Sequence, residues 1–170
     1  FAAFDSIGYP IAAFIDDNRI IKYLEAPAIS SEVQFAPSIS DSVFLLKLIP
    51  GIRPEILAYL GEHYDIIVIE SYGVGGIPFY DKRNFLNELR ALTEKGKIIV
   101  IATQVMLEGS DAEKYEVGAL ALDRYNVLQS FDMTVESAVT KLMWLCAEHE
   151  GYKEIRDGFY KCINHDLLYD

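Results

Sequence analysis

The chain has 170 residues, of which 51% are hydrophobic, and its 26 acidic residues against 15 basic ones give a formal net charge of −11. This length suits one compact domain with a substantial core and an extra piece at one end. The acidic balance argues against nucleic acid and against an anionic membrane surface as partners.

Two further features bear on the compartment and on the ends of the chain. Cys146 and Cys162 lack the spacing of a disulfide framework or of a zinc site, which favours a reducing compartment and predicts no metal. No apolar run reaches the roughly 18 residues that span a bilayer, so we expect a soluble chain. The sequence begins at Phe1, within FAAFDSIGYP, which reads as the middle of a longer sequence. We therefore expect an N-terminal portion to precede it.

Two apolar runs near the amino end predict a β-hairpin. Residues 10–15 (PIAAFI) and 20–24 (IIKYL) flank a polar turn at 16–19, a pattern typical of two antiparallel strands. From Glu25 to Asp41 the composition shifts to Pro, Ser and Ala without periodicity, which predicts a linker. We assign residues 1–40 to the end of a preceding N-terminal domain and the linker, and residues 41–170 to a C-terminal domain.

The rest of the chain alternates buried strands with amphipathic helices. The expected strands are Val43 to Ile49, Asp65 to Glu70, Lys97 to Val105 and a short edge strand at Asn126 to Gln129. The expected helices are a short one with Pro54 at its first position, Asp81 to Lys95, Tyr115 to Arg124, a long helix from the N-cap Thr134 to about His149, and Tyr152 to Cys162. Such alternation predicts a three-layer α/β/α fold of flavodoxin or Rossmann type, with a parallel sheet of about four strands.

Ligands bind at the carboxyl ends of the strands in such folds. Ser71 to Gly76 (SYGVGG) follows the strand at Asp65 and is one candidate loop, and Met106 to Ser110 after the next strand is another. The glycines are equally consistent with a turn that only reverses the chain. The first loop also lacks the GxGxxG spacing and the Walker lysine, so we expect no nucleotide and no other cofactor.

The polar side chains at these strand ends suit binding better than catalysis. Ser71 and the pair Thr103-Gln104, with the carboxylates Glu108 and Asp111, supply donors for a carboxylate and acceptors for an ammonium group. An amino acid ligand requires both. The three histidines lie at helix ends or in the tail, so no base is placed to activate a hydroxyl. We therefore expect no catalytic residue in the chain.

Several separate motifs, in order, resemble one family. They are SYGVGGIP after an apolar strand, IVIATQVMLEGSD, YEVG at 115–118 and DMTVESAVTKLMW at 132–144. These motifs look like the C-terminal domain of the type I, cytoplasmic L-asparaginases, and FAAFDSIGYPIAAF resembles the passage from the N-terminal domain of that family toward its linker. The resemblance implies a cytoplasmic amidohydrolase that converts L-asparagine to L-aspartate and ammonia.

The resemblance also implies partners. The nucleophilic threonine and the catalytic lysine of the family belong to the N-terminal domain, so the isolated chain should be inactive. Its implied partners are its own N-terminal domain, an amino acid substrate and further copies of itself in a dimer or a dimer of dimers. Its implied contribution is dimerisation and completion of the substrate pocket of the neighbouring subunit.

Individual positions follow from the same resemblance. The implied substrate-binding residues are Ser71, Gly75, Gly76 and Glu108, and the implied effector-binding residues are Thr103 and Gln104. Gly76 stands where many relatives have an asparagine, which removes a side-chain amide from the loop. Glu70 and Val105 stand where an allosteric relative has an arginine and a cysteine, so the resemblance does not by itself imply that regulation.

Two alternatives stay open at this point. One is the asparaginase-like subunit of an archaeal-type glutamyl-tRNA amidotransferase, which carries an additional N-terminal domain that the upstream sequence would reveal. The other is a non-catalytic amino-acid-binding or dimerisation module of flavodoxin-like type. Binding of asparagine or aspartate to the isolated chain would favour the second.

Overall fold

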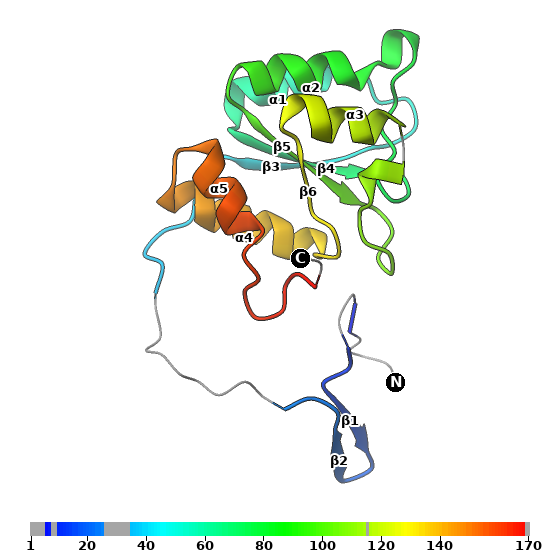
Figure 1. The fold of residues 1–170 in the computed structure, drawn as a ribbon, viewed down its shortest axis with the longest axis vertical. Coiled ribbons are helices and arrows are strands. Elements are labelled where there is room, and N and C mark those ends of the chain that lie inside the picture. Colours follow the sequence, from blue (N-terminus) through cyan, green and yellow to red (C-terminus); the bar gives the residue numbers. More distant parts are fainter. Residues whose placement is uncertain (1–5, 8–9, 26–34, 115, 169–170) are drawn as a thin grey trace.

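A computed structural model describes residues 6–7, 10–25, 35–114 and 116–168. Within them, four parallel strands form one sheet in the order β3-β4-β5-β6, and two antiparallel strands form a separate hairpin (Figure 1). The strands of the sheet are β3 (Val43–Lys47), β4 (Ile66–Ser71), β5 (Ile98–Thr103) and β6 (Leu128–Gln129). The predicted parallel sheet is confirmed. None of the described helices combines the length and the apolar composition needed to cross a membrane.

The two central strands explain why the sheet forms. Every residue from Ile66 to Ile69 in β4 and from Ile98 to Ala102 in β5 is buried. Continuous β-branched runs of this kind suit strands that are covered on both faces. The parallel register pairs Ser71 with Thr103, so the carboxyl ends of β4 and β5 lie level at one edge.

Helices cover both faces of this sheet. One face carries α1 (Glu55–His63), α2 (Phe85–Glu94) and α3 (Glu116–Tyr125), and the other carries α4 (Val135–Glu148) and α5 (Tyr152–Phe159) (Figure 1). The first three helices each connect a strand to its immediate neighbour. Because the strand order runs in one direction, right-handed crossovers place all three on the same face. The later helices close the opposite face, and the predicted three-layer fold is confirmed.

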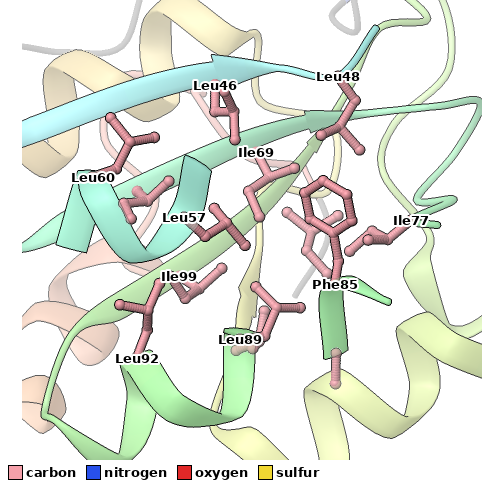
Figure 2. Packing of buried hydrophobic residues seen from close by; sticks show 14 of the residues in the cluster. Leu46, Leu48, Leu57, Leu60, Ile69, Ile77, Phe85, Leu89, Leu92 and Ile99 are labelled. Atoms are coloured by element: carbon pink, nitrogen blue, oxygen red, sulfur yellow. The ribbon is translucent and has the colours of Figure 1, made fainter. Parts of the chain in front are cut away.

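Alternate residues of the central strands supply two cores. Figure 2 shows the first core, where Ile69 and Ile99 meet Leu57 of α1 and Phe85 and Leu89 of α2. The second core joins the other side of the strands to α4 and α5, through residues such as Val68, Val100, Leu142, Leu145 and Phe159. Each fully buried side chain of this size contributes about 1.5–3 kcal/mol relative to an exposed one. The sheet edge that carries the candidate loops is therefore held from both sides.

The segment predicted as one helix from Asp81 to Lys95 is divided, so that prediction is wrong at its start. A 3-10 turn at Asp81–Arg83 comes first, and α2 begins after Asn84. The Asn84 side-chain oxygen accepts from the Leu86 amide at 3.0 Å and caps the helix, while its extended backbone ends the preceding turn.

One other helix end is shifted, and two predicted helix starts are confirmed. The last helix, α5, ends at Phe159 instead of Cys162. Pro54 stands directly before Glu55 with helical dihedral angles (φ −63°, ψ −23°), as expected for a proline that opens a helix. Thr134 caps α4 as predicted, because its hydroxyl oxygen accepts from the Ser137 amide at 3.2 Å.

The predicted hairpin is present in β1 (Ala13–Asp16) and β2 (Arg19–Lys22). Asp17 in its turn has a φ of 56°, a conformation that Asp and Asn adopt more readily than most residues. All residues of both strands are exposed, and Figure 1 shows the hairpin apart from the α/β layers. Its assignment to a preceding domain stays a prediction, and part of the predicted linker, residues 26–34, lies outside the described residues.

A buried lysine ties α4 to the end of the chain. The Lys141 ammonium group, whose side chain is 4% exposed, lies 2.8 Å from the Asp166 carboxylate and donates to the Lys161 carbonyl at 2.7 Å. The other Asp166 oxygen accepts from the Ile163 amide at 2.7 Å. Because both charges are paired and hydrogen-bonded, their burial is compensated.

Candidate functional site

The carboxyl edge of the sheet brings together the two loops that the sequence singles out. The glycine loop, residues 72–76, follows β4, and the acidic loop, residues 104–111, follows β5. The Asp111 amide donates to the Val74 carbonyl at 2.6 Å and joins the two loops directly. The predicted site residues therefore lie in one region, although their side chains do different things.

The glycine loop is closed by its own backbone. The Tyr72 amide donates to the Gly76 carbonyl at 3.0 Å, and the Tyr72 carbonyl accepts from Gly75 and Gly76 at 3.3 and 2.7 Å. Gly75 has a φ of 141°, and a Cβ there would lie 2.6 Å from the Ala112 Cα. Glycine is thus required at this position by conformation and by space. The N–H groups of Gly75 and Gly76 are therefore already used inside the loop. The contact of these two glycines with a substrate stays a prediction.

Ser71 faces the interior instead of an open cavity. Its side chain is fully buried, and its hydroxyl donates to the Ala102 carbonyl at 2.6 Å. This bond links the ends of β4 and β5. The structure gives Ser71 a role in holding the strand ends, and its predicted role in binding substrate stays a prediction.

Thr103 and Gln104 also hold the edge together, but both line an open cavity. The Thr103 hydroxyl donates to the Gly73 carbonyl and accepts from the Val105 amide. The Gln104 amide nitrogen donates to the carbonyls of Leu48, at 2.7 Å, and Glu70, at 2.9 Å. The two side chains thus connect β5 to the glycine loop and to the ends of β3 and β4. Their predicted role at an effector site stays a prediction.

Two cavities among the described residues open on either side of the acidic loop. The first, of about 560 Å³, lies toward β6, and the second, of about 340 Å³, lies toward β3 and the start of α4. Leu107, Glu108 and Gly109 line both. Of the predicted site residues, Glu108 is the one that reaches both cavities.

Carboxylates outnumber basic side chains in the lining of both cavities. Glu108 is exposed, and within the described residues its carboxylate makes no hydrogen bond or ion pair. Asp111 pairs with Lys114 at 3.1 Å in the first cavity, and Glu70 pairs with Lys47 at 2.9 Å in the second. An unpaired carboxylate on a cavity wall suits a cationic group such as an ammonium ion.

The hydroxyl groups at this edge are not arranged for nucleophilic catalysis. Those of Ser71 and Thr103 donate to backbone carbonyls, and Ser110 lies 3.2 Å from the Ser130 hydroxyl. In the described part of the chain none of them is hydrogen-bonded to a histidine, lysine or carboxylate, which an activated nucleophile requires. The described residues also contain no group of three or more His, Cys, Asp or Glu that could hold a metal ion. The hydroxyls of Ser71, Thr103 and Ser110 therefore join the strand ends and loops of this edge to one another.

The sequence reasoning missed the polar end of β6. Gln129 is 5% exposed, lines the first cavity, and accepts from the Ala112 amide at 3.0 Å through its side-chain oxygen. Ser110 meets Ser130 next to it, and the Ser110 amide donates to the Phe131 carbonyl at 2.6 Å. Gln129 and Ser130 show the same sequence signal that identified Ser71. In both places polar residues directly follow an apolar run.

Comparison with known proteins gives the family. The model of the glutaminase/asparaginase C-terminal domain matches residues 42–159. The chain is 38% identical over 154 residues to an L-asparaginase of Thermococcus kodakarensis, covering 91% of this chain and 46% of that protein. It is 29% identical over 159 residues to a glutamyl-tRNA(Gln) amidotransferase subunit from Methanosphaera stadtmanae, covering 89% of this chain and 35% of that protein.

A solved structure agrees with this assignment. The thermostable L-asparaginase from Thermococcus kodakarensis superposes with a TM-score of 0.88 at 34% identity, covering 99% of this chain and 50% of the other. The chain belongs to the glutaminase/asparaginase C-terminal domain family. It spans less than half the length of the two curated relatives described above.

Proposed function

We propose that the chain is the C-terminal domain of a cytoplasmic L-asparaginase, which hydrolyses L-asparagine to L-aspartate and ammonia when joined to its N-terminal domain. The observation that carries this proposal is the likeness to the Thermococcus kodakarensis L-asparaginase over 91% of the chain. Amide hydrolysis needs an activated nucleophile and groups that stabilise the oxyanion. The hydroxyls at the sheet edge are committed to structural bonds, so the isolated chain is inactive.

The topology of the sheet supports a site that needs a second domain. Open α/β sheets bind ligands where the strand order reverses, since adjacent loops there diverge and leave a crevice. The order β3-β4-β5-β6 runs in one direction, so the described sheet has no such reversal. Its carboxyl edge offers two open cavities, and in this proposal another domain covers them and completes the substrate pocket.

The acidic loop supports contact with a partner. Met106 is 70% exposed and Leu107 is 80% exposed, next to the unpaired Glu108. Methionine is enriched in protein interfaces, and two neighbouring exposed apolar side chains fit a surface that another chain covers. In the proposed homo-oligomer, this loop faces the neighbouring subunit, where it delivers Glu108 to the substrate.

Glu108 then binds the α-ammonium group of asparagine. That group is positively charged and does not react, so the pocket needs a fixed negative partner for it. A charge-assisted hydrogen bond of this kind contributes roughly 1.5–3 kcal/mol. Ser71, Gly75 and Gly76 line neither cavity, and in this proposal they hold the strand end and the glycine loop that support the pocket. Thr103 and Gln104 line the second cavity, where an effector would bind.

A fusion protein tests this proposal. Three proteins are compared. They are a fusion of the N-terminal part of the Thermococcus kodakarensis enzyme with this chain, that N-terminal part alone, and this chain alone. The proposal expects ammonia release from asparagine by the fusion and none by this chain. A folded fusion that releases no ammonia contradicts the asparaginase function. Ammonia release by the isolated chain that a mutation in the chain abolishes contradicts its inactivity.

The amidotransferase alternative is favoured by the 29% identity to the Methanosphaera stadtmanae protein over 89% of the chain. It predicts an additional N-terminal domain in the upstream sequence, which the asparaginase proposal does not. The binding-module alternative predicts saturable binding of asparagine or aspartate to the isolated chain. The upstream sequence separates the asparaginase from the amidotransferase. Calorimetry of the isolated chain with asparagine and with aspartate tests the binding module.

A further inference from the structure

Three basic side chains line one hollow at the carboxyl edge, away from the acidic loop. Arg53, Lys82 and Arg83, with Gly51 and Glu55, surround a space of about 510 Å³, called the basic hollow below. Three cations thus face one carboxylate in a chain whose formal net charge is −11. A concave surface of one sign concentrates the electric field and attracts counter-ions.

The fold places these cations together from two separate loops. Arg53 lies between β3 and α1, and Lys82 and Arg83 form the 3-10 turn that precedes α2. Both loops leave the carboxyl ends of neighbouring parallel strands, so they meet at the same edge (Figure 1). Gly51, with a φ of 91°, contributes backbone without a side chain and leaves the hollow open.

None of the three cations forms an ion pair within the described residues. Every ion pair in that part of the chain uses other lysines and arginines. The hydrogen bonds that lysine and arginine side chains donate there also come from other residues. Like charges held near one another repel, and an anion between them relieves that repulsion. Two guanidinium groups suit the planar, bidentate binding of a phosphate or carboxylate, and a lysine adds a point charge.

A second, apolar hollow adjoins the first. It has a volume of about 230 Å³ and shares Gly51 and Arg83 with the basic hollow. The rest of its lining is apolar or aromatic: Ile49, Pro50, Ile52, Tyr72 and Pro78. An apolar space beside a cationic one matches a ligand with an apolar body and an anionic group.

We propose that the basic hollow and its apolar neighbour form a binding site for a small organic anion, whose phosphate or carboxylate group lies among Arg53, Lys82 and Arg83. The apolar body of that ligand packs against Tyr72 and Pro78. The site uses none of the residues assigned to the substrate or to the effector above. It is independent of the asparaginase function.

Titrations of the whole chain with simple probes test the site. Phenyl phosphate carries both parts of the expected ligand, benzoate replaces the phosphate by a carboxylate, inorganic phosphate lacks the apolar body, and phenol lacks the charge. Binding is followed by calorimetry and by amide chemical shifts at low ionic strength, since screening weakens exposed charge pairs. The site predicts saturable binding of phenyl phosphate or benzoate, weaker binding of inorganic phosphate and none of phenol. The tighter of the first two identifies the anionic group.

Charge-neutral variants locate the site. Arg53→Gln and Arg83→Gln should each weaken binding of the tighter probe roughly ten-fold, the loss of one charge-assisted hydrogen bond. Arg90→Gln removes an equal charge from an exposed pair with Glu94 on α2 and should leave binding unchanged. Amide dispersion confirms that each variant is folded. Absence of saturable binding in the wild-type chain, equal binding of phenol, or equal affinity in all three variants overturns the proposal.

Discussion

A Cβ atom on Gly75 would lie 2.6 Å from the Cα atom of Ala112, so the glycine loop and the segment before α3 touch backbone to backbone. Nearby, the Asp111 amide donates to the Val74 carbonyl at 2.6 Å. This contact fixes the distance between the loop after β4 and the loop that carries Glu108. The geometry of the first cavity depends on it.

Replacing Gly75 by alanine should therefore be costly. The residue adopts a φ of 141°, which side chains disfavour, and the new methyl group would collide with the Ala112 backbone. We expect a loss of about 3 kcal/mol in the free energy of unfolding, measured by urea denaturation. Gly96→Ala is the control, because Gly96 also has a positive φ, of 80°, but a Cβ there meets nothing within 4 Å. Equal losses in the two variants would show that packing against Ala112 does not matter.

The buried ion pair between Lys141 and Asp166 gives a second prediction. Lys141→Met removes the charge that balances Asp166 and leaves the Lys161 carbonyl without its donor. Breaking one half of a largely buried pair should lower the free energy of unfolding by about 3 kcal/mol. The double variant Lys141→Met/Asp166→Asn should recover part of this loss, since no lone charge remains. Lys153→Met, on the exposed side of α5, serves as the control and should change little.

The amino end of the sheet gives a prediction that depends on pH. Asp65 accepts from the Lys97 ammonium group at 2.8 Å and from the Ser42 hydroxyl at 2.6 Å, and these bonds lower the pKa of its carboxyl group. A lowered pKa means that the stabilisation is present above the pKa of the unfolded state, about 4, and is lost as pH falls through the lower folded value. The group is well exposed, so solvent screening limits the effect to about 0.5 kcal/mol.

Asp65→Asn should therefore destabilise the chain at pH 7 and have no effect near pH 2. Urea denaturation at both pH values measures the difference, with the exposed Asp123→Asn variant as the reference. A loss for Asp65→Asn that is the same at both values would assign it to the lost hydrogen-bond geometry and not to charge.

The fold follows from the sequence because its signals are local. Residues 66–69 and 98–102 are apolar at every position, so both faces of these strands must be covered. The stretch of chain between successive strands is long enough for one helix. The start of α2 is mispredicted because the polar residues 81–84 lead directly into the helical apolar period that begins at Phe85. That sequence does not show where the turn ends and the helix begins. The capping bond from Leu86 to Asn84 that separates them is a property of the folded backbone.

The candidate site follows from the sequence only in its location. A polar residue after a buried strand identifies the edge, but it does not reveal whether the side chain turns inward, as Ser71 does toward Ala102. Gln104 reaches the carbonyl of Leu48, which is 56 residues away in sequence, and no local pattern predicts that bond. The basic hollow escapes the sequence for the same reason, because Arg53 and Arg83 meet only once the two loops are folded.

The central claim, that this domain supplies a carboxylate to the substrate of a neighbouring subunit, is tested most directly by the kinetics of Glu108→Gln in the active fusion with an N-terminal asparaginase domain. The substitution keeps the size of the side chain and removes its charge, so kcat/KM for asparagine should fall roughly ten- to a hundred-fold while the oligomer persists. Glu62→Gln, an exposed change on α1, should leave the kinetics unchanged. A folded, oligomeric Glu108→Gln fusion with unchanged kcat/KM would contradict the claim and place Glu108 on the surface.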